Sequence, residues 1–173
     1  MVQADVTVSR QPLFSESQRL TQPWVWILVV LIALLAFWSF IQQIVFNQPF
    51  GGNAAPDWLL WTLLAAFGVG LPTVLAMARL DTRVYRDRIH LRYVPFASKS
   101  ISLDMIESVE AREYRPLREY GGWGLRWSPW AGSAFTVSGK HGVQLVLQGG
   151  RRFLIGSQQA EQLAGAIKKA QSH

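Results

Sequence analysis

Long apolar runs occupy much of the first half of the chain. The first, Trp24–Ile41, contains Ser39 as its sole polar residue, and the second covers Trp58–Ala78. A helix rises about 1.5 Å per residue, so either run can cross a hydrocarbon core of about 30 Å. The pattern predicts transmembrane helices at residues 23–46 and 57–78.

Helix breakers lie within the second run, at Gly68, Gly70 and Pro72. Proline removes a backbone hydrogen bond and glycine leaves room for a neighbouring helix, so we expect a kink there. A buried helical hairpin in a soluble protein would show similar runs. A signal peptide is disfavoured because the first run begins late and is too long.

The charges around these runs predict their orientation. Between Arg19 and Arg79 the one charged residue is Asp57, and the uncharged stretch 47–56 predicts a short extracytoplasmic loop in an antiparallel hairpin. Arginines precede the first run and crowd the exit of the second. Because cytoplasmic flanks carry an excess of Lys and Arg, we expect a bacterial inner-membrane protein with both termini in the cytoplasm.

Residues 1–22 form an N-terminal segment that reads FSESQRLTQP just before the first run. Ser15 and Gln18 have the spacing of a capping box. We therefore expect a short cytoplasmic helix at the membrane interface, with Phe14 and Leu20 toward lipid. Disorder is the other interpretation of this segment.

After Ala78 the pattern changes to alternation. In RIHLRYV, residues 88–94, the apolar positions fall on one face and the charged positions on the other, as in a half-buried strand. A hairpin turning at Asp87 is predicted before it. Two further strands flank a tight corner at 104–106, and SAFTVSG and GVQLVLQGGRRFLIGS continue the pattern.

In the stretch GVQLVLQGGRRFLIGS, the phase of the apolar residues predicts the length of the loop between two strands. A two-residue loop at Gly149-Gly150 would separate the face of Leu145 from that of Phe153. A three-residue loop, Gln148–Gly150, keeps both apolar sets together. We therefore predict the three-residue loop, with a glycine in the left-handed conformation.

The chain ends with SQQAEQLAGAIKKAQSH, which predicts one amphipathic helix. Ser157 is the expected N-cap, apolar residues recur at helical spacing from Ala160 to Ile167, and two lysines complement the C-terminal dipole. The fold class predicted is α+β. A two-helix transmembrane hairpin is followed, over residues 79–173, by a split β-barrel whose open end is capped by the C-terminal α-helix.

Several stretches resemble a known family. ISLDMIESVE, a glycine-rich middle, GVQLVLQGGRRFLIGS and the terminal helix are similar to bacterial pleckstrin-homology-like (PH-like) domains attached to paired membrane helices. FSESQRLTQPWVW and PLREYGGWGLRW look like signatures of one uncharacterised group of these membrane proteins. The resemblance runs from about Phe14 to Ala170. It implies a PH-like fold and a two-helix topology, but no ligand or catalytic residue.

No residue set favours an enzyme. The chain contains no cysteine, which excludes disulfides and thiolate chemistry. AFTVSGKH departs from a phosphate-binding loop at Ala134 and His141, no serine lies in Gly-x-Ser-x-Gly, and no histidine pair has metal-ligand spacing. The Glu and Arg residues of 107–119 alternate and neutralise one another. We expect no catalytic site, metal, cofactor or small-molecule substrate.

Arginine and tryptophan form the candidate contact set. From Arg79 onward fifteen basic residues face eight acidic ones, which favours attraction to anionic lipid as well as orientation of the hairpin. The tryptophans of YGGWGLRWSPW can cap the core, contact a partner or lie at the membrane surface. Nucleic acid is disfavoured because acidic residues are interspersed. The residues expected at the membrane surface or a partner are Arg79, Arg83, Arg86, Arg118, Trp123, Arg126, Trp127 and Trp130.

These observations favour binding over catalysis. The expected protein is a non-catalytic, membrane-anchored accessory or scaffold subunit of a larger membrane assembly, for example a respiratory or photosynthetic complex. Its expected partners are the lipid bilayer and other membrane proteins. The alternative is an independent module that senses anionic lipid or binds the membrane surface.

Overall fold

The computed structural model describes residues 11–49 and 55–172, and the chain divides into two compact units. One is a helical unit, Thr21–Met77. The other is a β domain to which the chain contributes both before and after the helices, up to Leu20 and again from Ala78 onward. The β domain is therefore discontinuous in sequence, which the predicted boundary at residue 79 did not anticipate.

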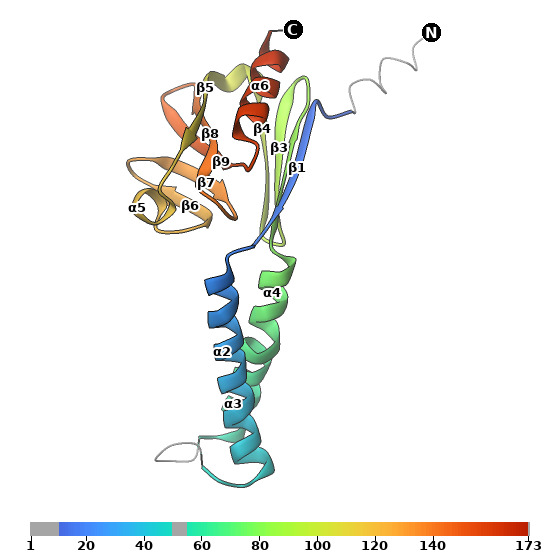
Figure 1. Ribbon diagram of the computed structural model, residues 1–173, viewed down its shortest axis with the longest axis vertical. Coiled ribbons are helices and arrows are strands. Elements are labelled where there is room, and N and C mark those ends of the chain that lie inside the picture. Colours follow the sequence, from blue (N-terminus) through green and yellow to red (C-terminus); the bar gives the residue numbers. More distant parts are fainter. Residues whose placement is uncertain (1–10, 50–54, 173) are drawn as a thin grey trace. The chain divides into compact units, whose positions relative to one another are not determined.

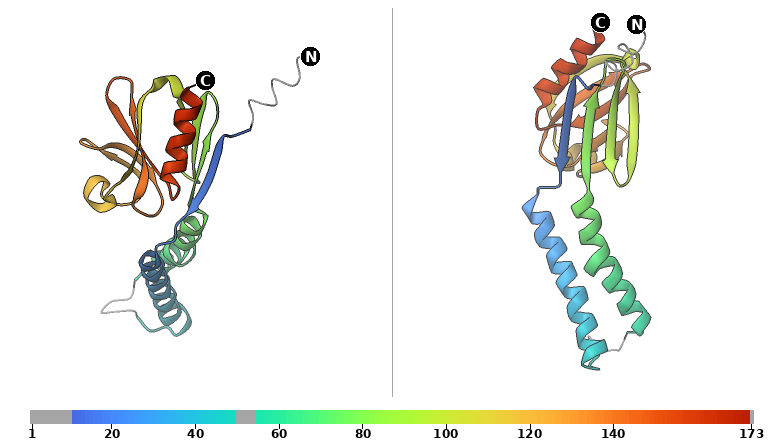
Figure 2. Two further views of the ribbon diagram at one scale, coloured as in Figure 1. Left: turned by 45° about the horizontal axis from the view of Figure 1, so that its top comes forward. Right: turned by 90° about the vertical axis from the view of Figure 1, so that its right-hand side faces the viewer.

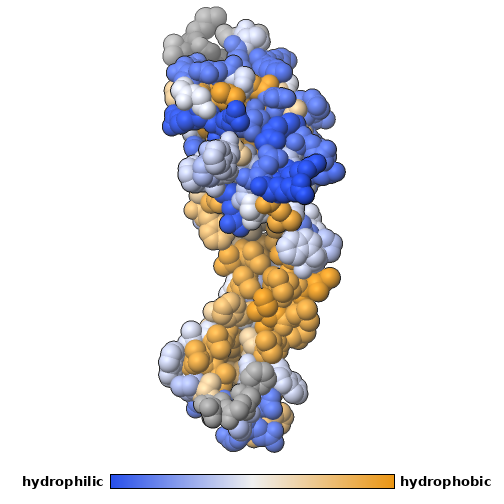
Figure 3. Space-filling model, turned by 90° about the vertical axis from the view of Figure 1, so that its left-hand side faces the viewer, coloured by the Kyte–Doolittle hydropathy of each residue, from blue (hydrophilic) through white to orange (hydrophobic). Residues whose placement is uncertain are grey.

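The helical unit contains two long apolar helices. The first consists of α2 (Pro23–Phe40) and the π-helical turn η1 (Ile41–Val45), and the second of α3 (Asp57–Leu63), the π-helical stretch η2 (Leu64–Gly70) and α4 (Leu71–Met77). Both are long and apolar enough to cross a membrane, judged by length and composition. Figure 3 shows a broad apolar surface over this unit on the face in view.

The second helix contains a π-helical stretch, η2, where a kink was predicted. This π-helical stretch contains Gly68 and Gly70, and Pro72 follows it. A Cβ atom at Gly68 would lie 3.3 Å from the ring of Phe37, so the glycine permits close approach of the two helices. Phe40 and Trp61 also meet edge to face, with ring centroids 4.6 Å apart.

The β domain contains two sheets (Figures 1 and 2). The antiparallel four-stranded sheet has the order β1-β2-β3-β4, and its strands are Phe14–Arg19, Arg79–Val84, Arg88–Val94 and Ala97–Ser102. The five-stranded sheet has the order β5-β8-β9-β7-β6. Its strands β5 to β9 are Ile106–Glu113, Gly124–Ser128, Gly132–Thr136, His141–Leu147 and Arg151–Gly156. Strands β7 and β9 pair in parallel.

Three short or terminal helices complete the domain. The 3-10 turn η3 (Leu103–Met105) leads from one sheet to the other, α5 (Pro116–Tyr120) follows β5, and α6 (Ala160–Gln171) ends the described chain. Helix α6 lies between the two sheets (Figures 1 and 2) and inserts Leu163 and Ile167 into the core. The described residues form two separate sheets, so the barrel is not closed.

Most strand predictions are confirmed. Ile89 and Leu91 are fully buried on the inner face of β3, and the β2–β3 hairpin turns at 85–87. The loop between β8 and β9 has three residues, and Gly149 and Gly150 both have positive φ. Leu145 therefore lies opposite Phe153, on the same side of the sheet.

The predicted interfacial helix before the first apolar run is wrong. Residues Phe14–Arg19 form β1, which pairs with β2 over its whole length, from Phe14 opposite Val84 to Arg19 opposite Arg79. The capping-box spacing is overridden because the edge of β2 offers backbone partners along all of the segment. No local pattern reports this pairing, since the partner strand lies beyond both helices.

The predicted N-cap of α6 is also wrong, because Gln159 occupies the cap position. Ser157 instead donates a hydrogen bond of 2.6 Å to Glu16 Oε2, and the Gln158 N–H donates to Glu16 Oε1 at 2.9 Å. The Gln18 side chain on the same strand donates to the Gly156 carbonyl oxygen at 2.8 Å. Strand β1 is thus tied to the chain just ahead of α6.

Candidate functional site

A cleft of about 620 Å³ lies on the outer face of the five-stranded sheet. Alternation along β5 places Val109 in the core and turns Glu110 and Arg112 outward. Helix α5 and the β6–β7 turn form the rim. The lining residues are Glu110, Arg112, Arg118, Glu119, Ser128, Trp130, Ala131, Gln144, Val146 and Arg152.

An ion pair between Arg112 and Glu119 organises the floor of this cleft. Arg112 Nη2 donates to Glu119 Oε2 at 2.7 Å and to Gln144 Oε1 at 3.0 Å, and the Arg115 backbone N–H donates to Glu119 Oε1 at 2.7 Å. Burial by itself would raise the pKa of Glu119, but these hydrogen bonds outweigh it and hold the pKa below its ordinary value. Glu119 is therefore a fixed, ionised acceptor.

Two buried tyrosines support the rim of the cleft from beneath. Tyr114 and Tyr120 pack edge to face at 6.2 Å between ring centroids, and the Tyr120 hydroxyl donates to the Ala131 carbonyl oxygen at 3.2 Å. Burial raises the pKa of Tyr114 to about 12. The bond to Ala131 links the end of α5 to the β6–β7 turn, so Arg118 and Trp130 are presented by a connected framework.

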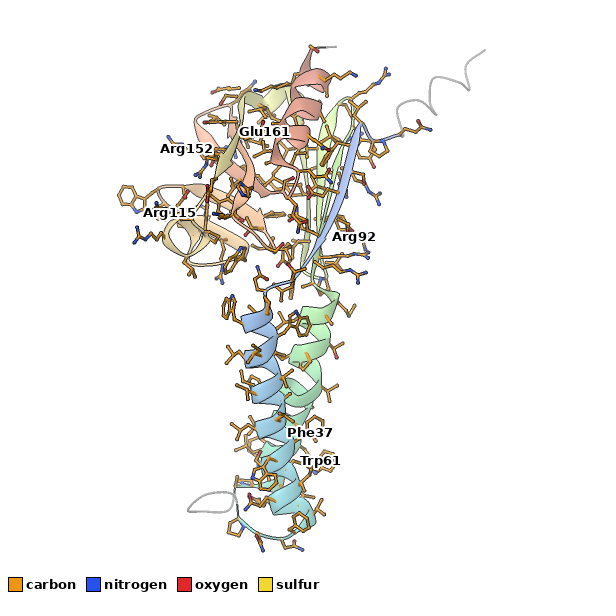
Figure 4. The ribbon with its side chains drawn as sticks, in the orientation of Figure 1. Phe37, Trp61, Arg92, Arg115, Arg152 and Glu161 are labelled. Atoms are coloured by element: carbon orange, nitrogen blue, oxygen red, sulfur yellow. The ribbon has the colours of Figure 1, made fainter. Side chains whose placement is uncertain are left out.

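Trp127 and Trp130 project into solvent from this framework. They are 72% and 88% exposed. Together with Arg151, Arg152 and Gly150 they line a second, smaller hollow of about 280 Å³. Figure 4 shows Arg152 and Arg115 extending outward from the five-stranded side of the domain. Core capping, one of the three roles considered for the tryptophans, therefore does not apply to Trp127 or Trp130.

Trp123 precedes the first residue of β6, and the side chain of Arg126, in the middle of that strand, reaches back to it. The Trp123 indole N–H donates to the Gly139 carbonyl oxygen at 2.8 Å, and Arg126 Nε donates to the Trp123 carbonyl oxygen at 3.1 Å. Burial raises the pKa of Tyr93 on β3, and the charge of Arg126 opposes that rise. Phe135, the partner of Leu125 on β7, packs against the buried cluster that contains Tyr93, so this part of β6 lies near the end of β3. The tryptophan loop therefore contributes to two different surfaces.

The arginines after the second helix are spread along the four-stranded sheet. Arg79 begins β2 and pairs with Asp81 at 3.3 Å, Arg83 lies further along its exposed face, and Arg86 lies in the β2–β3 turn. An extended strand rises about 3.3 Å per residue, so Arg86 is roughly 23 Å from Arg79 along the strand direction. The structure does not bring these three residues together.

Sequence reasoning missed several contributors to the cleft. The sequence pattern did not mark Arg151 or Arg152 as contact residues, and it marked Arg112 and Glu119 only as members of a mutually neutralising run. Outside the cleft, the sequence pattern also did not mark Phe96, a residue of the β3–β4 turn whose side chain is 58% exposed.

Within residues 11–49 and 55–172, no group of three or more His, Cys, Asp or Glu could hold a metal ion.

Comparison with known proteins identifies the family to which this chain belongs. Residues 8–173 match the family described as Family of unknown function (DUF6141), and because this covers nearly the whole chain, the protein is a member of that family. No curated protein matches the chain. The match covers the helical unit and the β domain together.

Proposed function

We propose that this protein is a non-catalytic, membrane-anchored accessory or scaffold subunit, whose β domain binds a protein of a larger membrane assembly through the outer face of its five-stranded sheet. The observation that carries this proposal is the exposure of Trp127 and Trp130 beside Arg118, Arg151 and Arg152. Interfaces are enriched in tryptophan and arginine, which anchor most of the binding energy.

The charges of the outer face favour an acidic partner segment. Arg118 and Arg152 form no ion pair among the described residues, whereas Glu119 is already neutralised by Arg112. A rim carboxylate of a partner could therefore pair with these arginines without displacing an internal bond. The tryptophans supply rigid apolar area next to them.

The pairing of β1 with β2 supports the proposed topology. Arg19 lies opposite Arg79, so the chain enters and leaves the helical unit from the same end of one sheet. If the two helices cross the membrane, both of their flanks must lie on one side of it. The positive flanks favour the cytoplasmic side of a bacterial inner membrane.

The architecture also supports a PH-like assignment for the β domain. Two sheets enclose one core, and the C-terminal helix α6 fills the open side between them. The first strand comes from before the helices, which extends the PH-like unit beyond residues 79–173. An independent lipid-sensing module is the second candidate, favoured by the exposed arginines Arg83 and Arg86.

Site-specific photocrosslinking in native membranes tests the proposal. A photoreactive phenylalanine analogue at Trp127 or Trp130 of the full chain should capture one protein, identified by mass spectrometry. The matched control places the analogue at Ser15, an exposed residue of the four-stranded sheet that lies opposite Arg83. The same protein adduct at Ser15 and Trp130, or adducts with lipid alone at Trp127 and Trp130, would contradict a partner site on the outer face.

A further inference from the structure

The turn between β3 and β4 carries an exposed aromatic side chain at a distinctive place. Phe96 is 58% exposed and packs against Tyr93 with 6.0 Å between ring centroids. In the sheet register Val94 lies opposite Arg79, and Arg79 lies opposite Arg19. We call this edge, from which the chain runs into both helices, the joining end of the β domain.

The strand register places Phe96 at the joining end, level with Val94. Strand β3 runs antiparallel to β2 and reaches Val94 opposite the first residue of β2. Tyr93 lies opposite Ala97, so the β3–β4 turn has its tip at Pro95, and Phe96 falls level with Val94 and Arg79. The turn projects on the side of the domain where the helices are attached.

Covalent reach limits how far this turn can lie from the helix ends, whatever the orientation of the two units. Arg79 follows Met77, the last residue of α4, by two positions, so their Cα atoms are at most about 8 Å apart. Val94 is about 5 Å across the sheet from Arg79, and Phe96 is two residues further. Its Cα thus lies within about 20 Å of the end of α4.

Cations surround the aromatic turn at this end. Arg19 and Arg92 are exposed on the outer face of the sheet. Arg126 is also exposed and follows Leu125, whose partner on β7, Phe135, packs against the buried cluster that contains Tyr93. Asp81 is engaged by Arg79 at 3.3 Å and by the Ser17 hydroxyl at 2.6 Å. An exposed phenylalanine among arginines matches the chemistry of a bilayer interface, where the ring enters the acyl boundary and guanidinium groups meet phosphates.

We infer that the joining end is a second membrane contact: Phe96 inserts into the interfacial region of an anionic leaflet while Arg19, Arg92 and Arg126 bind lipid phosphates. This inference rests on the proposed insertion of the two helices. It assigns the lipid role to the joining end. The turn that carries Trp130 begins at Ser128, four residues or about 13 Å along β6 from Gly124. The outer-face cleft is therefore assigned to a protein partner.

Fluorescence quenching on the full chain tests the inference, and the absence of native cysteine allows labelling at single introduced thiols. Phe96→Cys, Arg86→Cys and Leu34→Cys would each carry an environment-sensitive dye. The labelled proteins would be reconstituted in vesicles of equal parts phosphatidylcholine and phosphatidylglycerol that contain headgroup-level or acyl-chain nitroxide lipids. Arg86, in the turn at the opposite end of the same sheet, is the matched control.

We expect the dye at position 96 to lose most of its fluorescence to the headgroup-level nitroxide and the dye at position 86 to lose none. Quenching at position 34 with none at position 96 would overturn the inference and leave membrane insertion standing. Quenching at neither position would overturn both.

The role of the cations is tested by a second variant. Arg19→Gln, Arg92→Gln and Arg126→Gln, combined with Phe96→Cys, should weaken quenching at position 96, and omitting phosphatidylglycerol should have the same effect on Phe96→Cys alone. Quenching that is unchanged in both arms would show that the arginines bind no lipid phosphate. Unchanged thermal unfolding of the β domain confirms that these exposed positions were altered without loss of fold.

Discussion

The helical unit and the β domain place their apolar residues in opposite ways. Leu31 and Leu34 of α2 are both 59% exposed, whereas Leu91 and Leu145 of the β domain are fully buried. Removal of apolar area from water contributes about 25 cal/mol per Å² to stability, and the helices gain little of it within the chain. The β domain carries its own core, and the helical unit depends on its surroundings to cover its surface.

The largest expected effect comes from emptying the core of the β domain. Phe153 is 1% exposed, packs on Phe135 at 5.2 Å between ring centroids, and has Lys99 Nζ 4.5 Å from its ring centroid. Phe153→Ala should lower the free energy of unfolding by about 3–5 kcal/mol, measured by thermal or denaturant unfolding in mild detergent. Leu34→Ala is the control, and an equal loss there would remove the contrast between the two units.

A charge on the apolar surface of the helices should have the next largest effect. Lysine at the centre of a membrane helix costs roughly 3 kcal/mol of insertion free energy, so Leu34→Lys should reduce the membrane-integrated fraction after alkaline extraction. Leu117→Lys, at a residue of α5 that is 68% exposed, should leave that fraction unchanged. Full integration of Leu34→Lys would show that α2 does not face lipid.

The tie between β1 and α6 is expected to contribute less. Glu16 accepts hydrogen bonds from Ser157 and Gln158, and a bond to a charged group contributes about 1.5–3 kcal/mol. Glu16→Gln should lower the free energy of unfolding by an amount in that range and speed hydrogen exchange at the Gln158 amide. Glu107→Gln, at an exposed position of β5, is the control. Equal stability of the two variants would contradict the tie.

The smallest effect is expected at the floor of the outer-face cleft. The pKa of Glu119 is lowered in the folded protein, so its contribution is present above its unfolded pKa of about 4.3 and is lost as the pH falls through the lower folded value. Glu119→Gln should therefore cost roughly 1 kcal/mol or less at pH 7 and progressively less below about pH 4. Unfolding curves across this range measure it, and a difference that grows in acid would have the wrong sign.

Local features of the β domain were predictable because they depend on neighbouring residues. The inner face of β3 follows from alternation, and the loop Gln148–Gly150 follows from the phase of the two strands it joins. Each of these rests on interactions within about one strand or helical turn.

The candidate site was less predictable. Proximity in sequence grouped Arg79, Arg83 and Arg86, but an extended strand carries residues apart by about 3.3 Å each. The tryptophan loop was treated as one feature, whereas β6 sends Trp123 to one end and Trp130 to the other. Arg152 reaches the cleft only because β9 lies between β8 and β7 in the sheet.

The amino-acid sequence by itself determined the two apolar helices, the strands after them and the terminal helix, because periodic hydrophobicity selects each element locally. Only the tertiary structure showed that residues 14–19 complete a sheet whose other strands lie beyond the helices. It likewise showed that Glu16 binds the chain ahead of α6. The physical reason is that such contacts join residues separated by most of the chain, and their polar partners become recognisable only once the backbone has brought them within hydrogen-bonding distance.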